Sequence, residues 1–109
     1  MYFRLKILQG LNEGKEIAIR TTQCVIGREE GCDLRINNDS IGHKHCVIVS
    51  SKSESVIRDL NSRDGTFVND QRIARDVVLL NGDILKVGPY LFKVIIERTR
   101  PKAYRPKFG

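Results

Sequence analysis

Hydrophobic and polar residues alternate along most of this chain. Near the start, Phe3, Leu5 and Ile7 fall on one face of an extended segment, while Arg4 and Lys6 fall on the other. An alternation with period two is typical of a β-strand that has one buried face. Similar patterns and short β-branched or apolar runs predict further strands at residues 15–19, 23–26, 34–36, 46–49, 56–59, 67–68, 72–73, 77–80, 84–87 and 90–96.

Turn residues separate these strands at short intervals. Asn69-Asp70-Gln71 predicts a tight hairpin, and Asn81-Gly82-Asp83 predicts a second hairpin that joins residues 77–80 to residues 84–87. The apolar run at residues 46–49 is suited to a buried central strand. No segment has a helical stripe of useful length. About ten or eleven short strands with this spacing predict an all-β fold, a sandwich or barrel of antiparallel strands.

The size and composition of the chain fit one globular domain. It has 109 residues, of which 40% are hydrophobic and 29% are charged. No apolar stretch approaches the roughly 20 residues that a membrane-spanning helix needs, and residues 1–6 alternate instead of forming the apolar block of a signal peptide. We therefore expect a cytoplasmic protein with no membrane partner.

The positive charge is concentrated at one end of the chain. The formal net charge is +6, and residues 98–109 contain five of the Lys and Arg residues and no acidic residue. Residues 1–97 are therefore nearly neutral, which weakens the case for nucleic acid as a partner of the domain. We predict a folded domain at residues 1–97 and an extended or disordered basic segment at residues 98–109. A solvated linker is the preferred interpretation of that segment, with nucleic-acid binding as the alternative.

The three cysteines do not suggest a disulfide or zinc framework. Cys24, Cys32 and Cys46 are odd in number and irregularly spaced, with no CxxC pair. His43 and His45 lie two residues apart beside Cys46, but no fourth metal ligand is suggested. We expect reduced thiols, no metal and no cofactor.

Three short segments stand out when they are read together. Gly27-Arg28 ends a strand, residues 41–46 (Ile-Gly-His-Lys-His-Cys) enter another, and residues 59–69 read Asp-Leu-Asn-Ser-Arg-Asp-Gly-Thr-Phe-Val-Asn. A Gly82-Asp83 turn follows downstream. The order, spacing and local sequence of these segments resemble the forkhead-associated (FHA) family over residues 3–96.

The resemblance implies a fold and a function. The fold is the FHA-type (SMAD/FHA-like) antiparallel β-sandwich of about eleven strands. The function is recognition of phosphothreonine in a partner protein by loops at one end of the sandwich, a role typical of signalling modules. It implies no enzyme activity and no small-molecule substrate. The residues agree, since Ser40 and Ser62 have no base partner for nucleophilic catalysis, and Asp59 and Asp64 fall within a binding motif.

The resemblance also assigns roles to individual residues. Arg28 is the main phosphate clamp, because a guanidinium offers a rigid fork of donors to a phosphate, and Arg63 is a second clamp. His43, Gly42 and Asp64 line the same site. The residues expected to support the site structurally are Gly27, His45, Gly65 and Asn69.

Two positions depart from the family pattern. Aligning His45 with the family histidine places Gly42 where the phosphate-binding serine stands, so the hydroxyl donor is missing. A second register, which we do not prefer, would align Ser40 with that serine and His43 with the histidine. Asp64 replaces an asparagine, and a carboxylate accepts hydrogen bonds but cannot donate them.

These departures have an energetic consequence. At about 6 Å, a carboxylate repels a phosphate dianion by about 1 kcal/mol in bulk water and about 5 kcal/mol at an effective dielectric constant of about 20. A lost hydrogen bond from the hydroxyl costs a further ~1.5–3 kcal/mol. Together they predict phosphopeptide binding weakened by about a hundredfold or more, with Arg63, His43 and Lys44 as sources of compensation. The runner-up hypothesis is a phosphate-independent interaction domain that keeps the fold but not the pocket.

Overall fold

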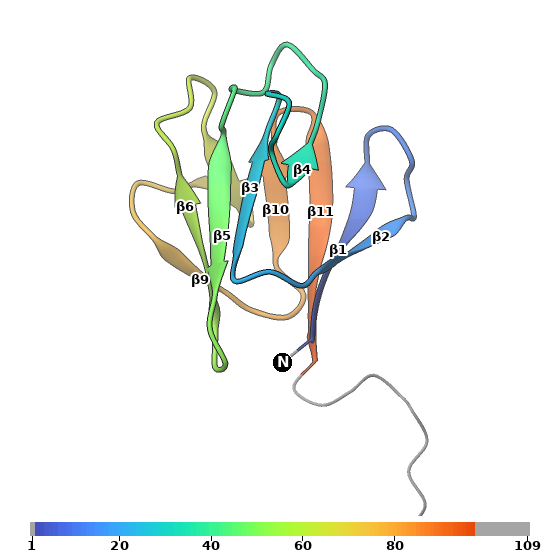
Figure 1. Ribbon diagram of the computed structural model, residues 1–109, viewed down its shortest axis with the longest axis vertical. Coiled ribbons are helices and arrows are strands. Elements are labelled where there is room, and N and C mark those ends of the chain that lie inside the picture. Colours follow the sequence, from blue (N-terminus) through green and yellow to red (C-terminus); the bar gives the residue numbers. More distant parts are fainter. Residues whose placement is uncertain (1, 98–109) are drawn as a thin grey trace, which may run out of the picture.

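A computed structural model describes residues 2–97 of the chain, and these residues form eleven β-strands (Figure 1). The predicted segment at residues 98–109 lies outside the described residues. Within residues 2–97 no helix is long and apolar enough to cross a membrane. The strands are β1 (Tyr2–Gln9), β2 (Glu16–Ile19), β3 (Gln23–Gly27), β4 (Leu34–Arg35), β5 (Cys46–Ser50), β6 (Ser55–Asp59), β7 (Thr66–Val68), β8 (Gln71–Arg72), β9 (Val77–Leu79), β10 (Ile84–Val87) and β11 (Tyr90–Glu97).

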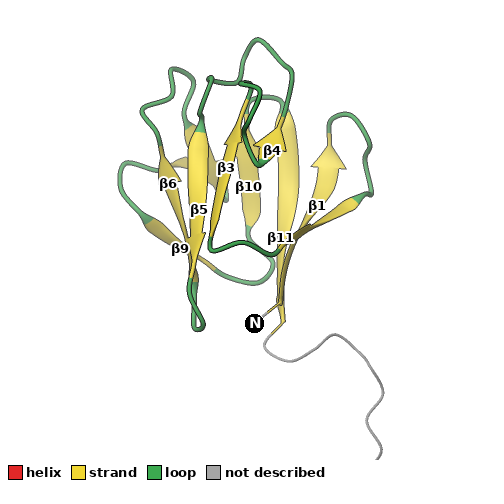
Figure 2. Ribbon diagram, in the orientation of Figure 1, coloured by secondary structure: helices red, strands yellow, loops and turns green. Residues whose placement is uncertain are grey.

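The strands form two sheets that pack face to face, as Figure 2 shows. One sheet has six strands in the order β2-β1-β11-β10-β7-β8, and the other has five in the order β4-β3-β5-β6-β9. The predicted all-β sandwich is therefore confirmed. All the paired strands run antiparallel except β3 and β4, whose short pairing is parallel.

The core lies between the sheets, where every second side chain of a strand points inward. Along β1, Phe3, Leu5 and Ile7 are 4%, 0% and 5% exposed, as their period-two spacing predicts. Each fully buried apolar side chain of this size contributes about 1.5–3 kcal/mol through its removal from water. The other buried side chains that complete the core include Ile26, Cys46, Ile48, Ile57, Leu85, Val87, Phe92 and Val94.

Strand β5 occupies the centre of the five-stranded sheet, as its apolar run predicts. Its first three residues, Cys46, Val47 and Ile48, are buried, whereas Val49 is exposed on the outer face. The β7–β8 hairpin is also confirmed, but its turn contains two residues rather than three. Asn69 and Asp70 have φ values of 51° and 68°, so the turn resembles the primed type that suits the twist of a two-residue hairpin.

The predicted hairpin between residues 77–80 and 84–87 is wrong. β9 pairs with β6 in the five-stranded sheet, whereas β10 pairs with β7 and β11 in the six-stranded sheet. The intervening turn therefore crosses between sheets. Main-chain hydrogen bonds from Gly82 to Val94 and from Val94 to Asp83 fasten it to β11. Leu79 and Leu85 both face the core, but from opposite sheets.

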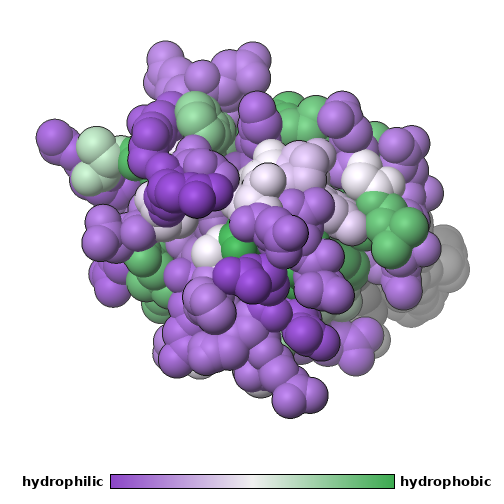
Figure 3. Space-filling model, turned by 90° about the horizontal axis from the view of Figure 1, so that it is seen from above, coloured by the Kyte–Doolittle hydropathy of each residue, from purple (hydrophilic) through white to green (hydrophobic). Residues whose placement is uncertain are grey.

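The loops that carry the motif residues gather at one end of the sandwich. The β3–β4, β4–β5 and β6–β7 loops lie at the top of Figure 1, and the N-terminus lies at the opposite end. Figure 3 looks down on the loop end and shows mainly hydrophilic side chains there, with a small apolar area between them. The two sheets therefore form a rigid scaffold that carries three irregular loops at one end.

We expect Leu85→Ala to lower the free energy of unfolding by about 2–5 kcal/mol, because it empties a fully buried position. Leu80→Ala makes the same chemical change at a side chain that is 63% exposed, so it should cost less than about 0.5 kcal/mol. Urea unfolding followed by circular dichroism measures both. Similar losses for the two variants would contradict the buried position of Leu85 and the exposed position of Leu80.

Candidate functional site

Main-chain hydrogen bonds hold the start of the β3–β4 loop against the end of the β4–β5 loop. The N–H of Arg28 donates to the oxygen of Gly42 at 2.9 Å, and the N–H of Glu29 donates to the oxygen of His43 at 3.0 Å. These contacts involve no side chain. They place Arg28 beside residues 42 and 43 whatever those residues are.

Gly27 is required by this close approach. A Cβ atom at Gly27 would lie 2.2 Å from the main-chain oxygen of His43, which cannot move without breaking the loop contacts. Gly42 is different, because a Cβ there would lie 3.7 Å from the nearest atoms of His45, an ordinary van der Waals contact. The predicted supporting role of Gly27 therefore has a steric basis, and position 42 has room for a side chain.

His45 joins the β4–β5 loop to the β6–β7 loop. Its imidazole is completely buried, and the N–H of Gly42 donates to its Nδ1 at 3.0 Å. Nδ1 must therefore be the acceptor, which places the ring hydrogen on Nε2. Nε2 in turn donates to the main-chain oxygen of Gly65 at 2.8 Å. The buried bridge at His45, with His43 exposed, supports the preferred register of the motif.

Asp59, at the end of β6, holds the β6–β7 loop through hydrogen bonds to its carboxylate. Its carboxylate accepts hydrogen bonds from the hydroxyls of Ser62 (2.6 Å) and Thr66 (2.7 Å) and from the N–H of Ser62 (3.0 Å). The Ser62 hydroxyl also accepts the N–H of Gly65 at 3.0 Å. Burial alone would raise the pKa of Asp59, but these donated hydrogen bonds outweigh it and hold the pKa below its ordinary value. Asp59 is therefore a scaffold residue, and no acid–base role is needed to explain it.

Between the loops lies a hollow of about 190 Å³. It brings together four of the five residues predicted to contact a phosphopeptide, namely Arg28, Gly42, Arg63 and Asp64, and its other lining residues are Asp39, Ser40 and Ile41. The fifth, His43, does not line the hollow but contacts Arg28. We refer to this space as the loop hollow.

Two contacts hold the Arg28 side chain within the loop hollow. Its Nε donates to the main-chain oxygen of Ile41 at 3.1 Å, and a terminal nitrogen donates to Nε2 of His43 at 3.2 Å. A guanidinium has no acceptor, so His43 accepts in this contact. Among residues 2–97, no carboxylate oxygen lies within 4.0 Å of the Arg28 guanidinium. Its remaining donors are available to a ligand.

Charges of both signs line the loop hollow. Arg63 and Asp64 form an ion pair at 3.3 Å, and their side chains are 84% and 43% exposed. Asp39 adds a second carboxylate, so two arginines face two aspartates. The sequence predicted one carboxylate, Asp64, beside the two arginines, and the structure adds Asp39 as a second one.

Sequence reasoning missed Asp39 and considered Ser40 only in the alternative register. Both residues reach the loop hollow because Asn38 forms a turn. Its side-chain oxygen accepts the N–H of Ser40 at 2.8 Å, and its main-chain oxygen accepts the N–H of Ile41 at 3.0 Å. The Asn-Asp-Ser run was a signal for this turn, since asparagine side chains commonly fold back on the main chain in this way.

The other two predicted supporting residues lie in different places. Gly65 has a φ of 88°, a main-chain conformation that favours glycine, and it lies under the flexible end of the Arg72 side chain, which would have to shift to admit a Cβ. Asn69 lies at the β7–β8 turn. It bonds to Asp83 and to the main chain of Ile84, and it makes no hydrogen bond to the residues of the loop hollow. Asn69 therefore stabilises the β9–β10 turn and not the loop hollow.

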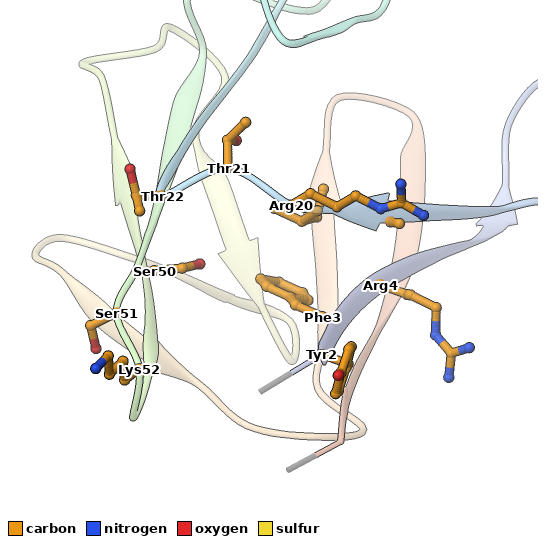
Figure 4. Close-up of a pocket in the computed structure, with 11 residues that line it drawn as sticks. Tyr2, Phe3, Arg4, Arg20, Thr21, Thr22, Ser50, Ser51 and Lys52 are labelled. Atoms are coloured by element: carbon orange, nitrogen blue, oxygen red, sulfur yellow. The ribbon is translucent and has the colours of Figure 1, made fainter. Parts of the chain in front are cut away.

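A larger hollow of about 850 Å³ lies at the other end of the sandwich (Figure 4). Thr22, Ser50, Ser51 and Lys52 form one wall, and Tyr2, Arg4 and Arg20 form the other. It contains none of the predicted site residues. The guanidinium of Arg4 is held by the carboxylates of Glu16 (3.5 Å) and Glu97 (2.6 Å), so it is not available to an anion.

Two of the three cysteines are buried thiols, and Cys32 is partly exposed. Cys24 and Cys46 are buried, and all three cysteines are free. Burial raises the pKa of Cys24 to about 11 and raises that of Cys46 further, so both thiols are protonated at neutral pH. Within residues 2–97 no group of three or more potential metal ligands was found.

Comparison with known proteins places these features in a family. The family model for the FHA domain matches residues 24–88. The proliferation marker protein Ki-67 of Mus musculus is 29% identical over 76 residues, which is 70% of this chain and 2% of Ki-67.

Two solved structures extend the likeness to nearly the whole chain. Mycobacterium tuberculosis EmbR, in complex with a low-affinity phosphopeptide, is 25% identical with a TM-score of 0.82, covering 93% of this chain and 26% of that one. The FHA domain of an Arabidopsis thaliana hypothetical protein is 28% identical with a TM-score of 0.79, covering 99% of this chain and 91% of that one. The chain therefore corresponds to a small part of Ki-67 and about a quarter of the EmbR chain, but to nearly the whole of the Arabidopsis FHA domain.

We expect Asp59→Asn to lower the free energy of unfolding at pH 7 by about 1–3 kcal/mol. An amide keeps one acceptor oxygen but turns an N–H₂ group toward the N–H of Ser62 or a hydroxyl that now donates to Asp59. The folded pKa of Asp59 is lowered, so its carboxylate stabilises the fold above the ordinary pKa of about 4, and this contribution is lost as the pH falls through the folded value.

The destabilisation should therefore shrink below about pH 4. Urea unfolding between neutral and acidic pH measures it, with Asp70→Asn on the exposed β7–β8 turn as the matched control. A difference between wild type and Asp59→Asn that does not change with pH would show that ionised Asp59 is not the stabilising species.

Proposed function

This chain belongs to the FHA domain family, and from that premise we propose that it binds phosphothreonine-containing segments of a partner protein through the loop hollow. In this proposal it is a signalling module of the cytoplasm that acts by binding and not by catalysis. The EmbR structure, of an FHA relative 25% identical over 93% of this chain, includes a phosphopeptide, which supports this class of ligand.

The observation that carries the proposal is the position of Arg28. Its guanidinium is partly buried, lines the loop hollow and is oriented by Ile41 and His43 without a carboxylate partner among the described residues. An oriented guanidinium with spare donors suits a phosphate dianion, because it loses little conformational freedom on binding. Arg63 is a second cation at the same rim.

The affinity we propose is modest. Asp64 and Asp39 place negative charge near the ligand, although the ion pair with Arg63 partly neutralises Asp64. Gly42 supplies no hydroxyl, but Ser40, which also lines the loop hollow, offers one. A phosphate-independent interaction through another surface is the competing function, and the first experiment below separates the two.

Fluorescence titrations should use degenerate peptide pools that carry phosphothreonine, phosphoserine or threonine at one fixed position. We expect the phosphothreonine pool to bind most tightly. Arg28→Ala should weaken that binding by about ten- to a hundredfold, the value of a hydrogen-bonded charge pair. Arg75→Ala removes an exposed arginine outside the loop hollow and should have little effect.

Equal affinity for the three pools would overturn the proposal. A native complex that survives both phosphatase treatment and Arg28→Ala would identify the phosphate-independent function instead.

We expect Gly42→Ser to tighten phosphothreonine binding by about tenfold or more, because it restores a hydroxyl donor beside the phosphate. The nearest atoms to a Cβ at this position are 3.7 Å away, so the substitution should not disturb the loop. Gly42→Ala is the matched control, since it adds the same Cβ without the hydroxyl. If both variants bind like the wild type, the hydroxyl at position 42 does not reach the ligand.

A further inference from the structure

We infer that this chain selects phosphothreonine flanked by lysine or arginine, and that Asp39 and Asp64 make the selection. This inference rests on the proposed phosphothreonine-binding function and adds the chemistry of the neighbouring peptide residues to it. It follows from the two carboxylates that line the loop hollow together with Arg28 and Arg63.

Asp39 is an exposed carboxylate on a hydrogen-bonded turn of the main chain. The turn made by Asn38 fixes the main chain on both sides of it through the N–H groups of Ser40 and Ile41. Among residues 2–97 it has no lysine or arginine nitrogen within 4.0 Å. A peptide that enters the loop hollow therefore meets a carboxylate that has no ion-pair partner among these residues.

Asp64 changes partners when a phosphate binds. In the structure it pairs with Arg63, whose side chain is 84% exposed and therefore free to turn. A dianion at Arg28 attracts Arg63 more strongly than a single carboxylate does, because the attraction scales with charge. Once Arg63 turns to the phosphate, Asp64 is left without its cation. A basic side chain of the peptide is the group that can replace it.

Charge balance favours the same ligand. Arg28 and Arg63 are offset by Asp39 and Asp64, so a phosphate alone would leave the loop hollow strongly negative. Acidic flanking residues would add to this charge, whereas lysine or arginine would cancel it. Lys44 is exposed but does not line the loop hollow, so its charge compensates the bound phosphate less than a charge inside the hollow would.

The experiment compares phosphothreonine peptide pools in which both neighbouring positions are fixed as Lys, Gln or Glu, each with its unphosphorylated counterpart, at low ionic strength. We expect the Lys-flanked pool to bind about tenfold tighter than the Glu-flanked pool, the size expected from one or two partly exposed ion pairs. Asp39→Asn with Asp64→Asn should reduce this ratio to less than about threefold. Glu54→Gln with Asp70→Asn removes two exposed acids outside the loop hollow and should leave the ratio unchanged.

The outcomes separate the two proposals. If phosphorylated and unphosphorylated pools bind equally, the phosphothreonine function itself fails. If phosphorylation matters but the flanking charge does not, only the present inference fails. It also fails if the Lys preference persists in the Asp39/Asp64 double variant or disappears in the control, since the preference would then arise from general charge. Thermal unfolding of each variant establishes that the fold is retained.

Discussion

The imidazole of His45 is the contact on which the binding end depends. It accepts the N–H of Gly42 and donates to the oxygen of Gly65, so it joins the β4–β5 loop of the five-stranded sheet to the β6–β7 loop, which crosses from that sheet to the other. Both partners are main-chain groups, and the ring is completely buried. Without the ring, neither group would keep this hydrogen bond, and an unsatisfied buried group costs about 1–3 kcal/mol. The ring therefore helps to fix the separation of the two rims of the loop hollow, together with the main-chain hydrogen bond from the N–H of Leu60 to the oxygen of His45.

The scaffold of the binding end does not use the side chains at the two positions that depart from the family pattern. Residue 42 contributes its N–H and oxygen to His45 and Arg28, and residue 64 contributes its side chain only to Arg63. A serine or a glycine at position 42 therefore fits the same main chain, as the space around it indicates. These departures change the charge and the donors of the loop hollow while the geometry is retained.

The sequence predicted which face of each strand is buried better than it predicted which strands pair with one another. Alternation identified the buried residues of β1, because the side-chain period of a strand is a local property. The same alternation could not show that the turn at residues 81–83 crosses between sheets, since Leu79 and Leu85 would face a core in either arrangement. Sheet membership depends on contacts far away in the chain, which local patterns do not contain.

For the site, motif residues were found and turn residues were missed. Arg28 and Arg63 were identified because they stand in segments that resemble the family motif, whereas Asp39 lies outside that motif and reaches the loop hollow through the turn that Asn38 makes. A pocket with equal numbers of cations and carboxylates contributes more to specificity than to affinity. A peptide whose charges are misplaced brings like charges together in such a pocket. In the function we propose, the mixed lining weakens binding to phosphate alone and lets the loop hollow choose among phosphorylated partners.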